Sequence, residues 1–255
     1  MNTPRVLLYD IETSLQLVSV FQLKHNDYID PDNIVQERYV ISVCYKWLGE
    51  NTIYAISLLD DPNRFAKDPH DDTFVVKEFH KILSTADCVI THNGDQFDHK
   101  YLRTRMLARN LPPLPPLTSI DTYKIAKSHF LFNANRLDYL GKFLGFGGKK
   151  QTAKGLWLRV LNGDKSAIRE MVTYNKHDVV LLEKVFMKLR PYAANHINRQ
   201  LFGLEGCPRC GSKHVQSRGV HKAISRTYRR YCCMDCGGWF RDMRPATTAT
   251  KHRVL

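Results

Sequence analysis

The fold is decided by the stretch RVLLYDIE, residues 5–12, a run of apolar side chains that ends in two acids. A short, nearly continuous apolar run predicts a strand buried on both faces of a parallel or mixed sheet. Asp10 and Glu12 are two residues apart, so on a strand their side chains leave the same face. They stand at the C-terminal end of the strand, where α/β sheets place their ligand crevices. Two carboxylates this close repel each other unless they share a cation. The alternative is an acidic strand end that faces water.

The rest of the first 190 residues has the apolar spacing of further strands and helices. Strands are expected at residues 39–47, 52–59, 87–91 and 118–121, and helices at residues 72–83, 97–109, 136–144 and 164–188. A turn at residues 49–51 joins the first two of these strands as a hairpin. The stretch LPPLPP, residues 111–116, is expected to be a stiff connector. The order β-β-β-α-β-α-β-α predicts an α/β domain with a mixed sheet flanked by helices.

Two more acids are placed to join the first pair. Asp98 ends the stretch HNGDQFD, residues 92–98, and falls in the first turn of the helix after the 87–91 strand. There it can point back across the strand ends, while Asn93 or Asp95 caps the helix. Asp178 lies four residues after Tyr174 on the last long helix, so the two side chains share one helix face. The apolar stripe of that helix puts Asp178 near its buried side, whereas an acid on an amphipathic helix ordinarily faces solvent.

Taken in this order and on these elements, the motifs resemble those of the DEDD exonuclease superfamily, which has an RNase H-like fold. That superfamily includes proofreading domains of DNA polymerases and several ribonucleases, and the resemblance covers roughly residues 5–190. Its histidine subtype carries His five residues before the last Asp, and that position is Thr173 here. Its tyrosine subtype carries Tyr four residues before, which is Tyr174. The stretch RLDYL, residues 136–140, is similar to the segment that precedes the third motif.

The resemblance implies a 3′–5′ exonuclease with two Mg²⁺ or Mn²⁺ ions, which activate a water and stabilise the leaving oxygen. Such hard ions prefer oxygen ligands. The expected ligands are Asp10, Glu12, Asp98 and Asp178. By resemblance, Asp10 bridges the ions, Glu12 and Asp178 lie on the nucleophile side, and Tyr174 orients the attacking water. Asn93 and Phe97 are expected at substrate-contact and packing positions. Asp95 and Asp121 are weaker candidates near the same cleft.

A second group of chemically active residues lies near the C-terminus, where two Cys-x-x-Cys knuckles occur. They consist of Cys207 with Cys210 and Cys233 with Cys236. Together they offer the four sulfurs of a tetrahedral zinc site. The segment resembles the zinc ribbons of some insertion-sequence transposases. Cys232 is left out, because using it in place of Cys233 would make a poorer Cys-x₃-Cys loop. A redox role is the alternative. Two other cysteines, at positions 44 and 88, fall in apolar strands and are expected to be inert core residues.

Positive charge is concentrated around these knuckles. The chain has a formal net charge of +13, and residues 205–255 hold 11 Lys or Arg against 3 Asp or Glu, a net charge of +8. Such a segment suits a polyanion, because neutralising phosphates releases condensed counterions. The residues expected to contact substrate here are Arg226, Arg229, Arg230, Tyr231 and Trp239. A merely structural ribbon that docks on the first domain is the alternative.

These features predict an exonuclease domain at residues 1–200, a zinc ribbon at 205–245 and a flexible basic tail at 246–255. The expected partner is nucleic acid, DNA in preference to RNA, with replication or repair proteins as further partners. No apolar run approaches the roughly 18–20 residues needed to cross a bilayer, and the N-terminus has no signal-peptide pattern. We therefore expect no membrane partner and a cytoplasmic protein, with a phage as one source of the gene. The alternative functions are an inactive nucleic-acid-binding protein and a transposition or replication accessory protein.

Overall fold

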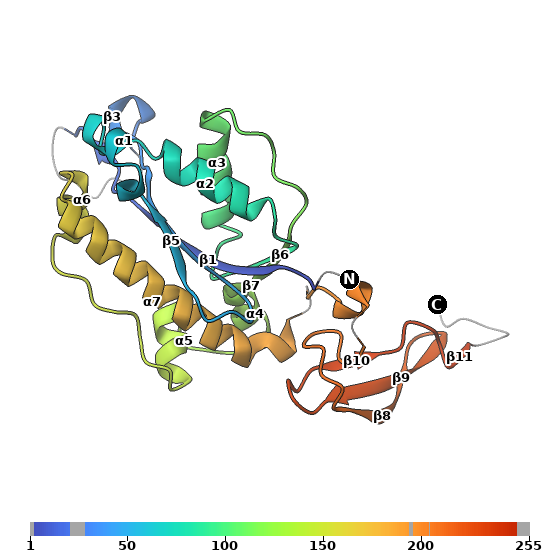
Figure 1. Cartoon of the computed structure of the whole chain (residues 1–255). Helices are drawn as coiled ribbons and strands as arrows, with labels where there is room; N and C mark the ends of the chain where they lie inside the picture. The colour runs from blue at the N-terminus through green and yellow to red at the C-terminus, as the bar shows by residue number, and fades with distance from the viewer. Residues whose placement is uncertain (1–2, 21–28, 194–195, 204, 249–255) are drawn as a thin grey trace.

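The central sheet has five strands in the order β5-β4-β1-β6-β7 in the computed structural model, which describes residues 3–20, 29–193, 196–203 and 205–248 (Figure 1). The strands are β1 (Val6–Thr13), β4 (Val40–Trp47), β5 (Tyr54–Ser57), β6 (Cys88–Thr91) and β7 (Thr118–Asp121). β1 runs antiparallel to β4 and parallel to β6. The mixed sheet predicted from the apolar runs is therefore confirmed, with the strand that carries Asp10 at its centre.

Helices cover both faces of this sheet, and strand alternation decides which residues each face receives. Figure 1 shows α2 (Thr73–Leu83) and α3 (Asp98–Ala108) on one side, and the long α7 (Lys165–Leu189) on the other. Leu7 and Tyr9 pack in a core with α2 and α3, whereas Val6 and Leu8 pack in a core with α7. The side chain of Asp10 follows that of Leu8 on the same face. The acids of β1 therefore face α7.

Several short elements went unpredicted, because a run of a few residues has too few positions to show a periodic pattern. They are β2 (Leu17–Val18), β3 (Ile34–Gln36), α1 (Pro62–Lys67), α4 (Thr122–His129), α6 (Leu156–Leu161) and the 3₁₀ turns at Pro31–Asn33, Leu58–Asp60, Arg190–Tyr192 and Arg199–Phe202. The predicted helix at 136–144 is α5 (Leu137–Phe143). The strand expected to reach residue 59 ends at Ser57, because Ser57 and Asp60 form a capping box that starts a 3₁₀ turn.

Among the described residues, no helix is both long and apolar enough to cross a membrane.

A small four-stranded sheet follows the end of α7 (Figure 1). β9 (Arg226–Cys233) is its central strand and pairs with β8 (Val215–Lys222), β10 (Trp239–Arg241) and β11 (Thr247–Thr248). We call this sheet and its cysteine loops the ribbon. It extends to Thr248, beyond the boundary expected at residue 245, and residues 249–255 of the predicted tail lie outside the described residues. The guanidinium of Arg190, at the end of α7, donates a hydrogen bond to the carbonyl of Arg209, and the guanidinium of Arg209 donates one to the carbonyl of Pro191.

Candidate active site and cysteine cluster

Three carboxylates from two elements meet at the centre of the sheet. Asp10 and Glu12 leave β1 on the face that α7 covers, and Asp178 leaves the middle of α7 toward them. One ligand oxygen from each of the three lies within 4.8 Å of the others. Asp178 is fully buried, and its Oδ1 atom has no hydrogen-bond partner. An unpaired buried carboxylate oxygen is costly, so this group of atoms is suited to a cation.

Asp98 lies beside these three acids but is not one of the mutually close group. It is the first residue of α3, is 6% exposed, and accepts a hydrogen bond of 3.3 Å at Oδ1 from the backbone N–H of Ile11. That donor is free because β6 pairs with β1 only as far as Leu8. The expected helix cap by Asn93 or Asp95 is wrong, since the N-cap position of α3 is Phe97 and no side chain caps it.

Burial and mutual repulsion raise the pKa of these acids. Burial raises the pKa of Asp10 well above its usual value, and the nearby carboxylates of Asp98 and Glu12 raise it further. Burial also raises the pKa of Glu12 to about 8 and that of Asp98 to about 6, although the N–H of Ile11 opposes the shift at Asp98. Carboxyl groups this crowded hold their charge only beside a cation. The residues present therefore fit divalent ions with oxygen ligands.

Lys149 is a cation in this cluster that sequence reasoning missed. Its Nζ lies 2.6 Å from Oδ2 of Asp178 and 5.4 Å from the centre of the Tyr174 ring. Burial lowers the pKa of Lys149, but the carboxylates of Asp10 and Asp178 outweigh burial and raise it overall. The backbone N–H of Lys149 donates a 2.8 Å hydrogen bond to Asp138. The only sequence signal was a lysine pair directly after the glycines that end the 136–144 helix.

Gly148, directly before Lys149, lies close to side chains of α5. A Cβ added there would lie 2.4 Å from Oδ1 of Asp138 and 2.4 Å from Cε of Lys142. Both atoms are ends of side chains, so a substitution at position 148 would have to displace them.

Asn175 is a second missed residue. It is fully buried on α7, and its Nδ2 donates a hydrogen bond of 2.6 Å to Oδ2 of Asp10. Asn175 and Asp178 are three residues apart and therefore share a helix face. That spacing was visible in the sequence, but only Tyr174 and Asp178 were selected from it.

A cleft of about 600 Å³ opens beside the acids. Its lining consists of Asp10, His92, Asn93, Tyr123, Arg136, Leu137, Asp138, Tyr139, Lys142 and Lys149. Asn93 is part of this lining, and its contact with substrate stays a prediction. Phe97 is not in the lining, and its ring stacks on that of Tyr101 with 5.8 Å between centroids.

The two weaker candidate acids hold the loop after β6 rather than facing the three-acid group. Asp121 accepts hydrogen bonds from the backbone N–H groups of Asn93 and Asp95, at 2.8 and 3.3 Å, and from that of Tyr123. Asp95 is paired with Lys124 at 2.6 Å and accepts a 2.6 Å hydrogen bond from Ser119. Both carboxyl groups are therefore engaged in structural contacts.

The RNase H superfamily model matches residues 47–190, more than half of the chain. This chain belongs to the RNase H superfamily. The matched region contains Asp98, Lys149 and Asp178 but begins after the two acids of β1. Membership supports nuclease activity in general.

Among solved structures, a family B DNA polymerase from the hyperthermophilic archaeon Pyrobaculum calidifontis is similar in fold, with a TM-score of 0.55 and 18% sequence identity. The similarity covers 81% of this chain and 26% of the polymerase, so the chain spans about a quarter of that protein's length. A search of curated protein sequences gave no match.

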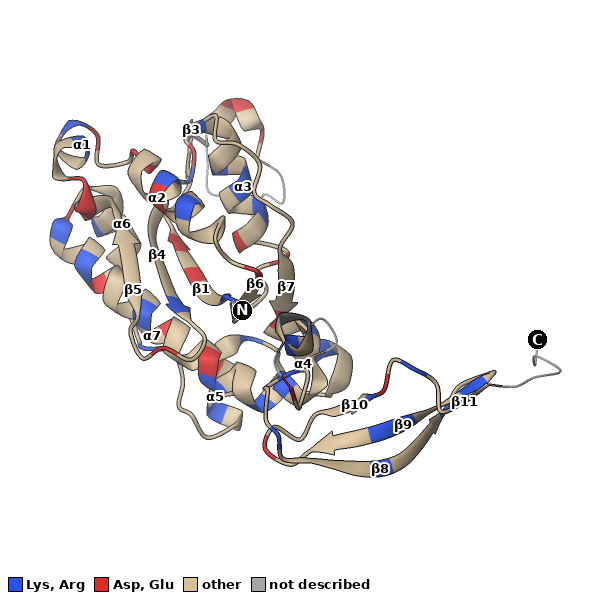
Figure 2. Cartoon of the chain, turned by 45° about the vertical axis from the view of Figure 1, so that its right-hand side comes forward, with Lys and Arg blue, Asp and Glu red and all other residues tan. Residues whose placement is uncertain are grey.

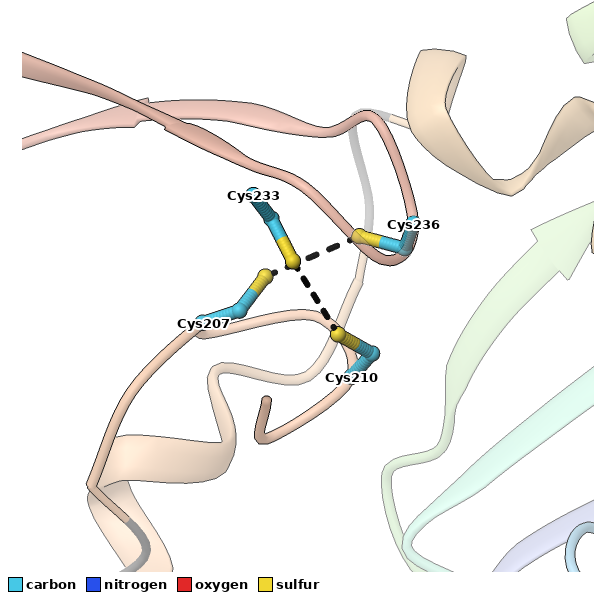
Figure 3. A group of neighbouring side chains, drawn as sticks. All are labelled: Cys207, Cys210, Cys233 and Cys236. Atoms are coloured by element: carbon cyan, nitrogen blue, oxygen red, sulfur yellow. Dashed lines mark hydrogen bonds between the residues drawn. The ribbon is translucent and has the colours of Figure 1, made fainter. Parts of the chain in front are cut away.

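Outside the RNase H-like region, the two cysteine knuckles form one cluster (Figure 3). The Sγ atoms of Cys207 and Cys236 are 3.7 Å apart, and those of Cys210 and Cys233 are 3.6 Å apart. Tetrahedral Zn–S bonds of about 2.3 Å imply S···S distances of about 3.8 Å. Burial raises the pKa of Cys210 and Cys236, whereas at Cys233 the backbone N–H groups of Cys236 and Asp235 outweigh burial and lower the pKa to about 7. The predicted four-cysteine cluster is therefore present, and Cys232 is not part of it.

The five residues predicted to contact substrate in the ribbon do not share one surface. Adjacent residues of a strand point to opposite faces, and β9 is regular over its length. Arg226 and Arg230 therefore lie on one face of the sheet with Trp239, which pairs with Cys232. Arg229 and Tyr231 lie on the other face. Figure 2 shows basic residues along β8 and β9.

Proposed function

We propose that this protein is a metal-dependent 3′–5′ exonuclease of the tyrosine subtype of the DEDD superfamily. The observation that carries the proposal is the meeting of Asp10, Glu12 and Asp178 within 4.8 Å at the edge of a cleft of about 600 Å³. That volume is typical of a site for a small organic ligand, such as a terminal nucleotide. No structural role explains why one buried and two partly buried carboxyl groups lie together, because their mutual repulsion opposes folding.

Asp10, Glu12, Asp98 and Asp178 would hold two Mg²⁺ or Mn²⁺ ions, as the crowding of carboxylate oxygens and the unpaired Oδ1 of Asp178 favour. Bound there, the ions supply a hydroxide near neutral pH and stabilise the leaving oxygen. Side chains of the protein would orient the metal ligands and the attacking water. Asn175 orients Asp10 through its 2.6 Å hydrogen bond.

Tyr174 acts as a hydrogen-bond donor and not as a base. Burial raises the pKa of Tyr174 to about 12, although the ammonium of Lys149 opposes the shift. The phenol is therefore protonated at neutral pH and can position a water but cannot remove its proton. One helical turn separates it from Asp178, so the oriented water would lie beside that carboxylate.

The cleft beside the acids suits the 3′ end of a nucleic acid strand. Arg136 and Lys142 can neutralise phosphates, and Tyr123 and Tyr139 offer aromatic surface for a base. Asn93, in the same lining, offers an amide to the sugar or base. DNA is the proposed substrate, in keeping with the similarity in fold to a DNA polymerase. Replication or repair proteins are the further partners that we propose, and the cytoplasm is the proposed location.

The ribbon is proposed to bind one zinc ion through Cys207, Cys210, Cys233 and Cys236 and to help hold the substrate. The sulfur-only donor set favours a soft ion over Mg²⁺ or Mn²⁺. The +8 charge of residues 205–255 supplies the attraction to phosphate.

Digestion of 5′-labelled DNA and RNA oligonucleotides side by side, with Mn²⁺ or Mg²⁺ added, tests the function. We expect single-nucleotide shortening from the 3′ end, faster on DNA. Asp10→Asn and Asp178→Asn should each abolish it, because each removes a charged oxygen ligand. Thr173→Ala is the matched control, since its exposed hydroxyl bonds only to the carbonyl of Arg169 on the same helix. Full activity in either Asp variant with an unchanged circular dichroism spectrum would overturn the assignment. Retained binding without any hydrolysis would indicate an inactive nucleic-acid-binding protein.

A further inference from the structure

One face of the ribbon sheet gathers arginine and aromatic side chains. By the strand alternation described above, Arg226, Tyr228 and Arg230 leave β9 on the same face. On the neighbouring strand β10, Arg241 is paired with Arg230, and residues paired across strands point to the same face. Trp239 lies two residues before Arg241, so Arg241 and Trp239 both lie on this face. We call these five residues the arginine face. Within the described strands, no Asp or Glu lies on it.

The arginines of this face are held over its aromatic rings. The guanidinium carbon of Arg241 is 4.1 Å from the centre of the Tyr228 ring, and that of Arg230 is 5.0 Å from the Trp239 ring. Nε of Arg230 also donates a 3.1 Å hydrogen bond to the carbonyl of Arg218. Trp239 nevertheless remains 50% exposed. These contacts hold the planar groups in place before any ligand arrives, which reduces the entropy lost on binding.

The opposite face of the sheet is arranged for packing. Tyr231 stacks on Phe240 with 5.4 Å between ring centroids, and its hydroxyl lies 3.3 Å from a carboxylate oxygen of Asp242. The backbone N–H of Asp242 donates a hydrogen bond to the carbonyl of Arg229, and the contact with Tyr231 places the Asp242 carboxylate on this side of the sheet. Among the described residues of the ribbon, the arginines that lie over aromatic rings are both on the arginine face.

We infer that the arginine face binds single-stranded nucleic acid, with phosphates on Arg226, Arg230 and Arg241 and an unpaired base stacked on Trp239. The inference rests on the proposed function, because it names the substrate form that the ribbon delivers to the nuclease. Guanidinium groups bind phosphate oxygens and stack on planar rings. Exposed aromatic rings contribute to binding single strands because every base has a π-face. In a duplex those π-faces are covered by neighbouring base pairs, so Trp239 gains nothing there.

The test is fluorescence anisotropy of a labelled 20-nucleotide oligothymidylate with the full chain, without added Mg²⁺ or Mn²⁺. Trp239→Ala should weaken binding about fivefold or more, as for the loss of one stacked base. Trp239→Phe should restore binding while removing the quenching of tryptophan fluorescence that accompanies it. Arg230→Ala should weaken binding and reduce the salt slope by about one.

Arg229→Ala is the matched control, because it removes the same charge from the neighbouring position on the opposite face. It should weaken binding less than twofold. Equal losses from Arg229→Ala and Arg230→Ala would overturn the inference, as would binding of a duplex as tight as that of the single strand. Hydrolysis of thymidine 5′-(p-nitrophenyl phosphate) by the unchanged protein tests the acidic site alone, since this substrate is too small to reach the ribbon. The inference and the proposed function can therefore fail separately.

Discussion

Asn175 on α7 donates a 2.6 Å hydrogen bond to Asp10 on β1, and this contact links the two elements that carry the acidic cluster. The amide donates to one oxygen of Asp10, whose carboxylate has a ligand oxygen within 4.8 Å of those of Glu12 and Asp178. It is a fully buried polar side chain with no other hydrogen bond. Its position is therefore explained by the carboxylate that it orients.

Replacing Asn175 by Ala should lower both Mn²⁺ affinity and hydrolysis by about 10- to 100-fold, as for other groups that orient a metal ligand. Isothermal titration with Mn²⁺ and oligonucleotide digestion would measure the two effects. Thr173→Ala, on the exposed side of the same helix, should change neither. Unchanged Mn²⁺ affinity in Asn175→Ala would show that the amide serves packing only.

Replacing Lys149 by Met should lower the melting temperature of the metal-free protein. The ammonium of Lys149 is the cation nearest to Asp178, and without it the buried carboxylates repel one another uncompensated. Added Mn²⁺ should then raise the melting temperature of this variant more than that of the natural protein, because the ion supplies the missing charge. Thermal denaturation with and without Mn²⁺ measures both quantities. Lys150→Met, which removes an exposed charge one residue away, is the control, and an identical Mn²⁺ response in both variants would contradict the prediction.

The Tyr174→Phe variant should have turnover reduced by about a hundredfold, as when one aligned donor is removed from an active site. Its affinity for oligonucleotide and for Mn²⁺ should stay within about twofold, because the ring and the carboxylates are retained. Single-turnover digestion measures the loss of turnover, and Mn²⁺ titration measures the affinity for the ion. Loss of Mn²⁺ binding would instead assign the hydroxyl a role in holding the ion.

The acids could be predicted from the sequence, and so could the position of Asn175 on their side of α7, whereas the contact of Lys149 could not. Period-two alternation places Asp10 and Glu12 on one strand face, and helical spacing places Asp178 on a buried face. Both arguments need only local geometry. Lys149 reaches the site from a loop whose backbone N–H donates a hydrogen bond to Asp138. Contacts of this kind join segments far apart in the chain and leave no periodic signal.

In the ribbon, by contrast, strand alternation alone determines which basic residues share a face. Arg229 and Arg230 are adjacent, so a strand at this position must place them on opposite faces. The number of basic residues in the segment does not show that they are divided between the two faces. The same alternation also separates Cys232 from Cys233, and it would have given a reason for choosing Cys233 beyond loop length.

Ending the chain at Gly203 should leave a folded nuclease, because the acids and the cores around the five-stranded sheet lie before that position. The shortened protein loses the segment with a net charge of +8. Its binding to oligonucleotides should therefore weaken and depend less steeply on salt. Anisotropy titrations between about 50 and 200 mM salt measure the slope. An unchanged affinity and slope would favour a protein partner for the ribbon.

Zinc content should respond to Cys233 and not to its neighbour Cys232. Elemental analysis of the natural protein should give about one zinc per chain. Cys233→Ser should lower that value, because the Sγ of Cys233 lies 3.6 Å from that of Cys210 inside the cluster. Cys232→Ser should leave it unchanged, because Cys232 lies on the opposite face of β9 with Trp239. The two variants differ by the same atom at adjacent positions, so a difference between them reports only the direction of the side chain. If zinc were lost from Cys232→Ser but retained in Cys233→Ser, the register of β9 would be shifted by one residue from the one described. Every arginine of that strand would then lie on the opposite face.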